Sequence, residues 1–488
     1  MQALSTLPVE SCHRLWQYFV QGGPNNGDNL LSYAASLLGG ADEWREPAPL
    51  LRAGIYWPDA GAVDLAHLQA QWTPGAAVVA ITFYRALYQA GNLEPVDAVI
   101  LGLRDRGLNP LPIFVASLKE PLSAETVNAV FAEAAPDIIL NTTGFAVSKP
   151  NGERADSPLE RPGVPIIQMI FAGGNEDGWR DNSNGLSARD IAMNVALPEV
   201  DGRIISRAVS FKAEARFDPA AQLSVIAYRA VADRVDFVCE LAANWLGLAR
   251  TPVQDRRVAL IFANYPNRDG RLGNGVGLDT PASALNLLRA MAAAGYGVGD
   301  LPDAGDALIR RLAAGPSNDL THRRDRQGGI KFAVADYLKF FATLPGEMQT
   351  QVTGRWGPPD QDPFVASDNF ILSAFRQGNV VIGLQPARGY NIDPKSSYHD
   401  PALVPPHGYL AFYAWLRQDF QAQAIIHMGK HGNLEWLPGK SVALSENCYS
   451  EAALGPLPHL YPIIVNDPGD GTQAKRRAQA VIVDHLTP

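Results

Sequence analysis

Hydrophobic side chains change their spacing along the first 145 residues. Residues 10–40 have apolar positions at helical spacing, and the run Gly22-Gly23-Pro24-Asn25-Asn26-Gly27 predicts a break that leaves two helices. Short apolar runs then predict strands at residues 52–57, 76–82, 112–115 and 137–141. Stretches of helical period lie between them at residues 84–90, 96–106 and 124–134. This alternation is typical of a parallel sheet with helices on both faces.

The alternation returns further along the chain. Residues 214–248 are polar at first and become helical from 232 to 246. Further strands are predicted at residues 164–171, 257–263, 379–385, 423–427, 461–466 and 480–483, and further helices at 187–190, 281–294, 331–344, 408–422 and from 473. We therefore expect an α/β fold of several domains, with mostly parallel βαβ-type sheets and a helical N-terminal segment.

Composition shifts and Pro/Gly-rich stretches divide the chain into five expected segments. These are a helical remnant of a truncated N-terminal region (1–48), a βαβ domain (49–163), a mixed α/β segment with a long helix (164–252), an α/β domain with a Gly-rich loop (253–345), and an α/β domain truncated at its C-terminal end (346–488).

Composition and charge narrow the class of protein. The 488 residues are 47% hydrophobic and 19% charged, as in globular proteins, and are enough for three or four domains. A net charge of -9 argues against a nucleic-acid partner. Three scattered cysteines, no apolar run of about 18 residues and no signal-peptide pattern predict a cytoplasmic protein without a membrane span.

The candidate chemistry concentrates in residues 424–441, where His427, His431 and Glu435 follow one another at intervals of four. In a straight helix the first and last would lie about 12 Å apart, too far to share one ion. They converge only if the backbone bends, which Gly429 and Gly432 permit. We expect a buried strand, a glycine turn and a short helix, with the polar groups at the carboxyl end of the strand. Spacing alone leaves a metal site and hydrogen-bonded core residues about equally open.

Three other features have weaker implications. Polar residues at 83–85 and 141–144 follow predicted strands and indicate either a cleft or ordinary turns and caps. The Gly-rich loop 270–277 lacks the acidic partner of a dinucleotide site, so its glycines either let the backbone approach a ligand or let it fold back tightly.

The spacing of glycines near Lys440 does not fit a phosphate-binding loop. Six residues separate Gly432 from Gly439-Lys440-Ser441, and such a loop requires four, so we do not expect this chain to hydrolyse ATP.

Residues 427–445, HMGKHGNLEWLPGKSVALS, resemble the signature of the large subunits of aerobic cobaltochelatase, the CobN family, which is homologous to the magnesium chelatase H subunits. Lys430, Asn433 and Trp436 match the cobalt branch, where the magnesium branch typically has Thr, Ser and Phe. Residues 263–283, 398–417 and 457–488 also resemble the family, so the resemblance covers nearly the whole chain. It implies a fragment of well under half of such a large subunit.

The resemblance implies a ligase that forms nitrogen–metal bonds. The expected function is that of the tetrapyrrole-binding large subunit of an ATP-dependent cobaltochelatase, which inserts Co²⁺ into hydrogenobyrinic acid a,c-diamide in cobalamin biosynthesis. Co²⁺ is then the substrate metal, and the corrin-precursor tetrapyrrole is the other substrate. An AAA+ ATPase subunit with a companion subunit is expected to hydrolyse ATP, with Mg²⁺. The fragment alone is expected to be inactive.

Metal insertion needs ligands for the ion, an acceptor for the inner N–H protons and groups that hold the carboxylate-rich ring. His427, His431 and Glu435 would bind the metal, and Glu435 and His431 would act as the catalytic groups. Hydrogen-bond partners for the ligating histidines would come from His399, Asp400 and His407, unless that Pro-rich segment is only a capped loop. Substrate binding is assigned to Arg268, Arg271, Arg388, Lys395, Lys430, Asn433 and Trp436.

Other residue groups are expected to be structural. The trio Lys475-Arg476-Arg477 is interpreted as a solvated helix face in preference to a carboxylate-binding group. Phe412, Tyr413 and Trp415 have helical spacing and are expected in the core, which leaves Trp436 as the candidate for ring stacking.

Three alternative functions remain. A magnesium chelatase H subunit, which inserts Mg²⁺ into protoporphyrin IX, is disfavoured by Lys430, Asn433 and Trp436. A non-catalytic tetrapyrrole-binding scaffold would leave the chemistry to other segments. A stand-alone metallohydrolase lacks support because the sequence contains no HExxH helix.

Overall fold

The computed structural model describes residues 5–149, 155–264, 272–273, 278–320, 328–390, 400–429, 432–464 and 468–485. The chain forms two compact units. The N-terminal unit comprises Met1–Glu176, Ala192–Arg203 and Val209–Cys239, and the C-terminal unit comprises Asp177–Ile191, Ile204–Ala208 and Glu240–Pro488. The five finer segments expected from the sequence stay a prediction.

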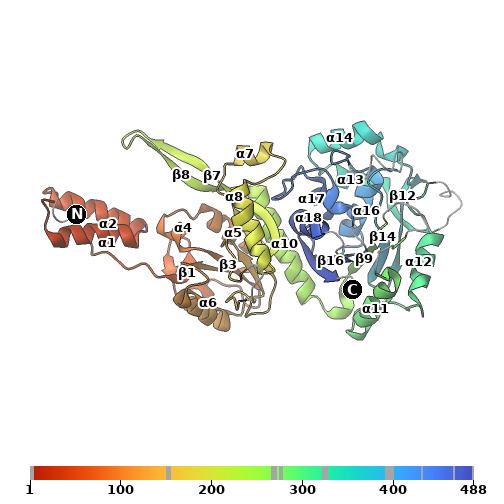
Figure 1. The fold of residues 1–488 in the computed structure, drawn as a ribbon, viewed down its shortest axis with the longest axis horizontal. Helices are drawn as coiled ribbons and strands as arrows, with labels where there is room; N and C mark the ends of the chain where they lie inside the picture. Colours follow the sequence, from red (N-terminus) through yellow and green to blue (C-terminus); the bar gives the residue numbers. More distant parts are fainter. Residues whose placement is uncertain are drawn as a thin grey trace. The chain divides into compact units, whose positions relative to one another are not determined.

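The N-terminal unit begins with a helical hairpin, as the glycine-rich break predicts. Helix α1 (Val9–Gln21) ends at Gly22 and α2 (Pro24–Leu37) begins with a proline in its first turn. Gly22 and Gly23 have φ values of 65° and 87°, which residues other than glycine rarely adopt. The glycines therefore set the point at which the two helices separate (Figure 1).

An eight-stranded sheet follows, in the order β2-β1-β4-β3-β5-β6-β7-β8. Its central strands β4, β3, β5 and β6 run parallel, while β1 is antiparallel to β2 and β4, and β7 to β8. The strands are β1 (Ala53–Trp57), β2 (Gly61–Val63), β3 (Val78–Tyr84), β4 (Asn109–Val115), β5 (Ile138–Asn141), β6 (Ile166–Phe171), β7 (Ile204–Asp218) and β8 (Leu223–Ala230).

Helices α3 to α6 and α9 lie in the connections between strands of this sheet. Buried residues of α6 pack with residues of β1, β3 and β4 in one core cluster. The buried side chains of α5 are not members of that cluster. The helices of this unit are α3 (Leu65–Gln69), α4 (Arg85–Gln89), α5 (Glu94–Arg104), α6 (Pro121–Ala134) and α9 (Leu197–Val200), which follows the π-helical turn Ala192–Ala196. Helix α8 (Ala188–Ile191) and all but the first residue of α7 (Glu176–Asp181) belong to the C-terminal unit, and α10 (Ala232–Arg250) begins in the N-terminal unit and ends in the C-terminal unit.

Residues 214–230 differ from the prediction, which placed a polar approach to a helix there. They form the outer part of the β7–β8 hairpin. The exposure of β7 alternates beyond residue 212, which is the pattern of a strand with solvent on its faces. The prediction missed this strand because it was based on apolar residues, and several of these positions carry charged side chains.

The C-terminal unit contains a six-stranded sheet in the order β13-β14-β9-β15-β16-β17. All its pairs are parallel except the edge pair of β13 and β14. The strands are β9 (Val258–Phe262), β13 (Ala374–Gln377), β14 (Val380–Leu384), β15 (Ala424–Met428), β16 (His459–Ile464) and β17 (Ala480–His485). These parallel sheets confirm the predicted α/β class.

The remaining elements of this unit include a small sheet in the order β10-β12-β11. Its strand β10 (Ile330–Ala333) takes the first residues of the stretch predicted as a helix, and α13 (Val334–Phe341) takes the rest. The other elements are β11 (Val365–Ala366), β12 (Asn369–Leu372), α11 (Thr280–Ala293), α12 (Gly305–Ala314), α14 (Gly346–Trp356), α16 (His407–Gln418), α17 (Tyr449–Leu454) and α18 (Pro468–Arg477).

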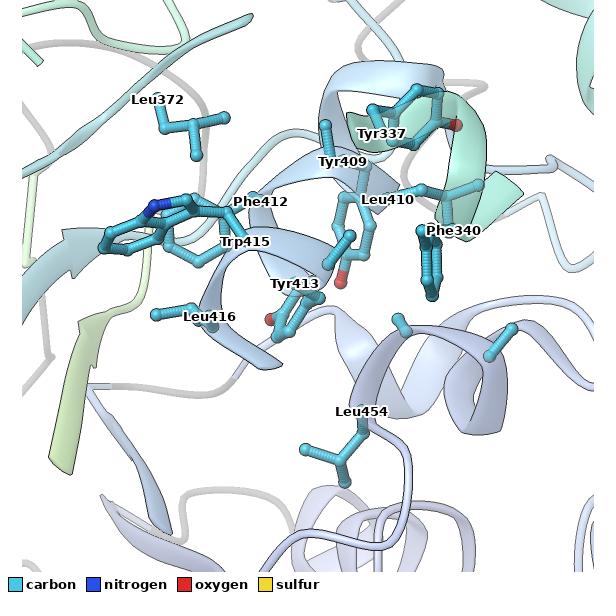
Figure 2. Close-up of a cluster of buried hydrophobic side chains, with 14 of the residues drawn as sticks. Tyr337, Phe340, Leu372, Tyr409, Leu410, Phe412, Tyr413, Trp415, Leu416 and Leu454 are labelled. Atoms are coloured by element: carbon cyan, nitrogen blue, oxygen red, sulfur yellow. The ribbon is translucent and has the colours of Figure 1, made fainter. Parts of the chain in front are cut away.

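Helix α16 lies at the centre of the largest core cluster. Ten successive residues from His407 to Leu416 are buried, so the helix is enclosed on every side. Figure 2 shows its aromatic side chains beside Tyr337 and Phe340 of α13 and Leu454 of α17. Phe412, Tyr413 and Trp415 are core residues, as predicted. No helix within the described ranges is long and apolar enough to cross a membrane.

Candidate functional site

The stretch singled out in the sequence lies where the six-stranded sheet reverses its order. From β9 the chain passes to β14 on one side, and then crosses to β15 on the other side. Ligands of open α/β sheets bind outside the carboxyl ends of strands at such a switch point. His427 is in β15, and Glu435 is in the 3-10 helix Leu434–Trp436 that follows. The predicted strand is confirmed, the expected glycine turn includes residues 430–431, which lie outside the described residues, and the short helix is a single 3-10 turn.

Two glycines let the backbone close this point tightly. Gly429 has φ 145°, and a Cβ built on it would lie 2.7 Å from the Cβ of Ala263, just beyond the end of β9. A Cβ on Gly432 would lie 2.9 Å from the hydroxyl oxygen of Tyr461. A side chain at either position would push apart the segments on which His427 and Glu435 lie.

His427 is the middle of a chain of hydrogen bonds whose direction is fixed at one end. The Nδ1 of His459 lies 2.9 Å from the carbonyl oxygen of Ala478, so it must donate. His459 Nε2 then accepts from Nδ1 of His427 at 2.7 Å. The Nε2 of His427 accepts in turn from the hydroxyl of Tyr413 at 3.0 Å. Both ring nitrogens of His427 are therefore in use.

The environment keeps both rings neutral. Burial lowers the pKa of His459 to about 4, and burial followed by the neighbouring His459 lowers the pKa of His427 well below its usual value. Tyr413 is held in the protonated, donating form, because burial raises its pKa. A metal could reach His427 only by displacing Tyr413 or His459, so the arrangement favours a positioning role over the predicted direct ligation.

Glu435 is 1% exposed and fixed by contacts to its side chain and backbone. Its Oε1 accepts from Tyr461 at 2.7 Å, and the same hydroxyl accepts from the amide of Gly432. The guanidinium of Arg477 donates to the carbonyls of Glu435, Leu437 and Lys440. Arg477 is 7% exposed, so the prediction of a solvated face for it is wrong. Its contacts show that it holds the loop that presents Glu435.

Arg388 and Trp436 are positioned near this loop, and Asn433 is part of it. The buried Arg388 donates to the carbonyl of Asp400 at 2.8 Å and attracts the carboxylate of Glu435 electrostatically. Trp436 is 37% exposed and remains available for stacking. The side chain of Asn433 donates to Pro386 and accepts from Tyr409. Asn433 thus holds neighbouring segments together, which is a different task from the substrate contact predicted for it.

The two described members of the predicted second polar cluster, Asp400 and His407, form no hydrogen bond with His427. The Nε2 of His407 donates to the carbonyl of Gly357 at 3.0 Å, and its Nδ1 accepts from Tyr337 at 2.8 Å. These bonds attach the first turn of α16 to α13 and to the turn after α14. The exposed Asp400 caps its own loop by accepting from Ala402. The hydrogen-bond partners of His427 are His459 and Tyr413 instead.

Six predicted site residues lie outside the described residues, namely Arg268, Arg271, Lys395, His399, Lys430 and His431. Within the described ranges, no group of three His, Cys, Asp or Glu side chains could hold a metal ion. The described contribution to the candidate site is therefore one carboxylate with the groups that orient it.

Sequence reasoning missed His459, Tyr461 and Gln385. His459 and Tyr461 are two apart on β16, so their side chains lie on the same face. That i,i+2 pair of polar residues in an apolar strand, next to the strand of His427, was the available signal. Gln385 directly follows β14, and its Oε1 accepts from the amide of Asn433 at 3.0 Å.

Comparison with known proteins shows the family to which the chain belongs. The CobN/Magnesium Chelatase family profile matches residues 16–488. The chain is 53% identical to the aerobic cobaltochelatase subunit CobN of Sinorhizobium sp and 50% identical to that of Pseudomonas aeruginosa, in each case over 100% of this chain and 39% of the relative. The magnesium-chelatase H subunit of Rhodobacter capsulatus is 30% identical over 97% of this chain and 40% of the relative.

A solved structure shares the fold. It is the catalytic subunit of cobaltochelatase from Mycobacterium tuberculosis, with a TM-score of 0.83 and 38% sequence identity over 99% of this chain and 40% of that chain. The present chain thus spans about two fifths of the length of the relatives it matches.

Proposed function

Because the chain belongs to the CobN/magnesium chelatase family, we propose that it forms part of the large subunit of an ATP-dependent cobaltochelatase. In this proposal the full-length protein binds a corrin-precursor tetrapyrrole, hydrogenobyrinic acid a,c-diamide, and receives Co²⁺. ATP is hydrolysed by an AAA+ ATPase together with its companion protein. The observation that carries the proposal is the identity of 50–53% to two CobN proteins, compared with 30% to a magnesium-chelatase H subunit.

Glu435 is the group we propose as the base. Metal insertion releases two protons from the inner nitrogens of the macrocycle, and a positioned carboxylate can accept them. Glu435 follows the switch point of the sheet and is held by Tyr461 and by the loop contacts of Arg477. Those contacts fix the carboxylate before substrate arrives, which lowers the cost of organising the site.

The metal-binding part of the proposal keeps Glu435 and His431 as ligands for the substrate Co²⁺. His427 is assigned to positioning, because Tyr413 and His459 already occupy its two ring nitrogens. A neutral imidazole and a carboxylate suit a borderline divalent ion such as Co²⁺ better than they suit Mg²⁺. Arg388 and Trp436 are the described candidates for contacts with the macrocycle, through its carboxylates and its plane respectively.

Metal preference of the full-length protein tests the proposal. We expect the full-length protein, reconstituted with its ATPase partners, to insert Co²⁺ into hydrogenobyrinic acid a,c-diamide and not Mg²⁺ into protoporphyrin IX. Preferential Mg²⁺ insertion into protoporphyrin IX would refute the cobaltochelatase assignment and favour the magnesium branch of the same family.

A further inference from the structure

The sheet of the N-terminal unit has a switch point of its own. From β3 the chain passes to β4 on one side, and then crosses to β5 on the other side of β3. All three strands are parallel, so their carboxyl ends meet at one edge. By the rule that applies to the candidate site of the C-terminal unit, this edge is where the N-terminal unit would bind a ligand.

A pocket of about 230 Å³ lies at this edge. Tyr84 from the end of β3, Ser117 and Lys119 from the loop after β4, and Thr143 and Phe145 from the loop after β5 line it. Pockets for drug-sized ligands enclose about 300–1,000 Å³, so this one suits a smaller molecule. The polar residues predicted at the ends of these strands therefore border a real recess.

Buried polar side chains fix the loop after β5 from below. Asn141, Gln168 and Arg203 all donate to the carbonyl oxygen of Thr143, at 2.9, 3.2 and 3.0 Å. Arg203 is buried and also pairs with Asp201 at 3.1 Å. Polar groups at this depth are costly to bury, and apolar residues would seal the end of a sheet equally well. Their convergence on one carbonyl holds the lining of the pocket in place.

Phe145 is the most unusual residue of the lining. Its φ is 62°, in the left-handed region that a bulky residue rarely adopts, and its side chain is 52% exposed. An exposed ring gives little packing energy in return for the backbone strain. Such strain persists where the surrounding structure imposes it and often marks a binding site. The ring offers a flat apolar surface at the pocket.

Lys119 gives the pocket its charge. It is exposed and forms no ion pair with any described residue. The adjacent carboxylate of Glu120 is paired with Arg52 and accepts from Ser123, so it is already partly neutralised. Ser117 accepts from the amide of Lys119 and keeps its hydroxyl proton to donate. The cation and the hydroxyl together suit an anionic group.

We propose that this pocket is a second ligand site, which binds a small molecule with an aromatic ring and a carboxylate or phosphate group. The ring stacks on Phe145, and the anion is bound by Lys119 and Ser117. The site is independent of the proposed chelatase chemistry, because it is built from the N-terminal unit alone.

Ligand-observed NMR of the 488-residue chain tests the proposal with phenyl phosphate and phenylacetate as probes. We expect at least one probe to bind saturably, and phenol and cyclohexyl phosphate, which lack the charge and the aromatic face respectively, to bind at least fivefold more weakly. Lys119→Gln and Phe145→Gly should each weaken binding at least fivefold. Lys339→Gln, an exposed lysine of α13, is the matched control and should leave binding unchanged.

Phe145→Gly separates a binding role from a structural one. Glycine adopts φ 62° without strain, so the variant should unfold at the same temperature as the wild-type chain or higher. Lower thermal stability would overturn the proposal, because Phe145 would then serve packing. It would also be overturned by an absence of saturable binding of both probes up to about 10 mM, or by equal binding in all variants.

Discussion

The buried pair His427–His459 makes the stability of the C-terminal unit depend on pH, and His459→Gln is the perturbation that measures it. The pKa of His459 falls from 6.5 to about 4 in the folded protein because the ring is fully buried. In the unfolded chain the ring binds a proton below pH 6.5, but in the folded chain it does so only near pH 4. The unfolded state therefore gains protons first, and stability is lost as the pH falls through this window.

The size of the effect follows from the shift. Each pKa unit is worth about 1.4 kcal/mol, so His459 alone should lower the free energy of unfolding by about 2 kcal/mol between pH 7 and pH 5, and by about 3 kcal/mol at pH 4. The lowered pKa of His427 acts with the same sign. In His459→Gln this part of the pH dependence should disappear. At pH 7 the variant should lose a further 1–3 kcal/mol or so, because buried hydrogen bonds are broken.

Hydrogen exchange of peptides from β15 and β16, read by mass spectrometry at pH 7 and pH 5, is the assay. It reports the opening free energy of these strands without unfolding of the N-terminal unit. The exposed His67 of α3 provides the matched control, and His67→Gln should keep the wild-type pH dependence. Equal pH dependence in the wild-type chain and His459→Gln would refute the neutral, buried histidine pair.

Three other substitutions test the loop that holds Glu435. Tyr461→Phe removes one hydrogen bond to a buried carboxylate and should cost about 1.5–3 kcal/mol of stability, measured by the same exchange assay. Arg477→Met removes donors to three carbonyls and should cost about 2–4 kcal/mol, measured by urea unfolding of the C-terminal unit. Gly429→Ala brings a Cβ to 2.7 Å from that of Ala263 and should lower stability by about 1–3 kcal/mol in a thermal scan.

For each of these substitutions, one result would contradict the prediction. Wild-type exchange rates in Tyr461→Phe would mean that Glu435 is held by other groups. Arg476→Met, next to Arg477 on α18, is the control for Arg477→Met, and equal losses in the two would remove the special role of Arg477. An unchanged melting temperature in Gly429→Ala would show that the loops can separate without cost.

Much of the fold could be predicted from the sequence where one face of an element is apolar. The strands that became β3, β5, β9 and β15 are nearly continuous apolar runs because they are buried on both faces. The β7–β8 hairpin was missed because its outer part projects charged side chains and buries little. The two strands pair with each other across a short turn, with Asp218 opposite Leu223, so the pairing is local, but strand propensity is a weak signal where few side chains are buried.

The candidate site was only partly predictable for a similar reason. The sequence stretch around His427 and Glu435 is local, so its spacing and glycines could be interpreted directly. The partners His459 and Arg477 come from β16 and α18, and the sheet order decides that they meet this stretch. A charge pattern cannot tell a buried arginine that caps carbonyls from one in solvent.

Single-turnover cobalt insertion by the reconstituted full-length protein tests the central claim most directly, with Glu435→Gln compared with wild type. We expect the rate to fall by about 10²–10⁴-fold while tetrapyrrole binding is retained, because the amide cannot accept the released protons. Glu347→Gln, an exposed glutamate of α14, should leave the rate unchanged. A Glu435→Gln protein that binds tetrapyrrole normally and inserts Co²⁺ at the wild-type rate would contradict the account, and would assign this region to a binding scaffold.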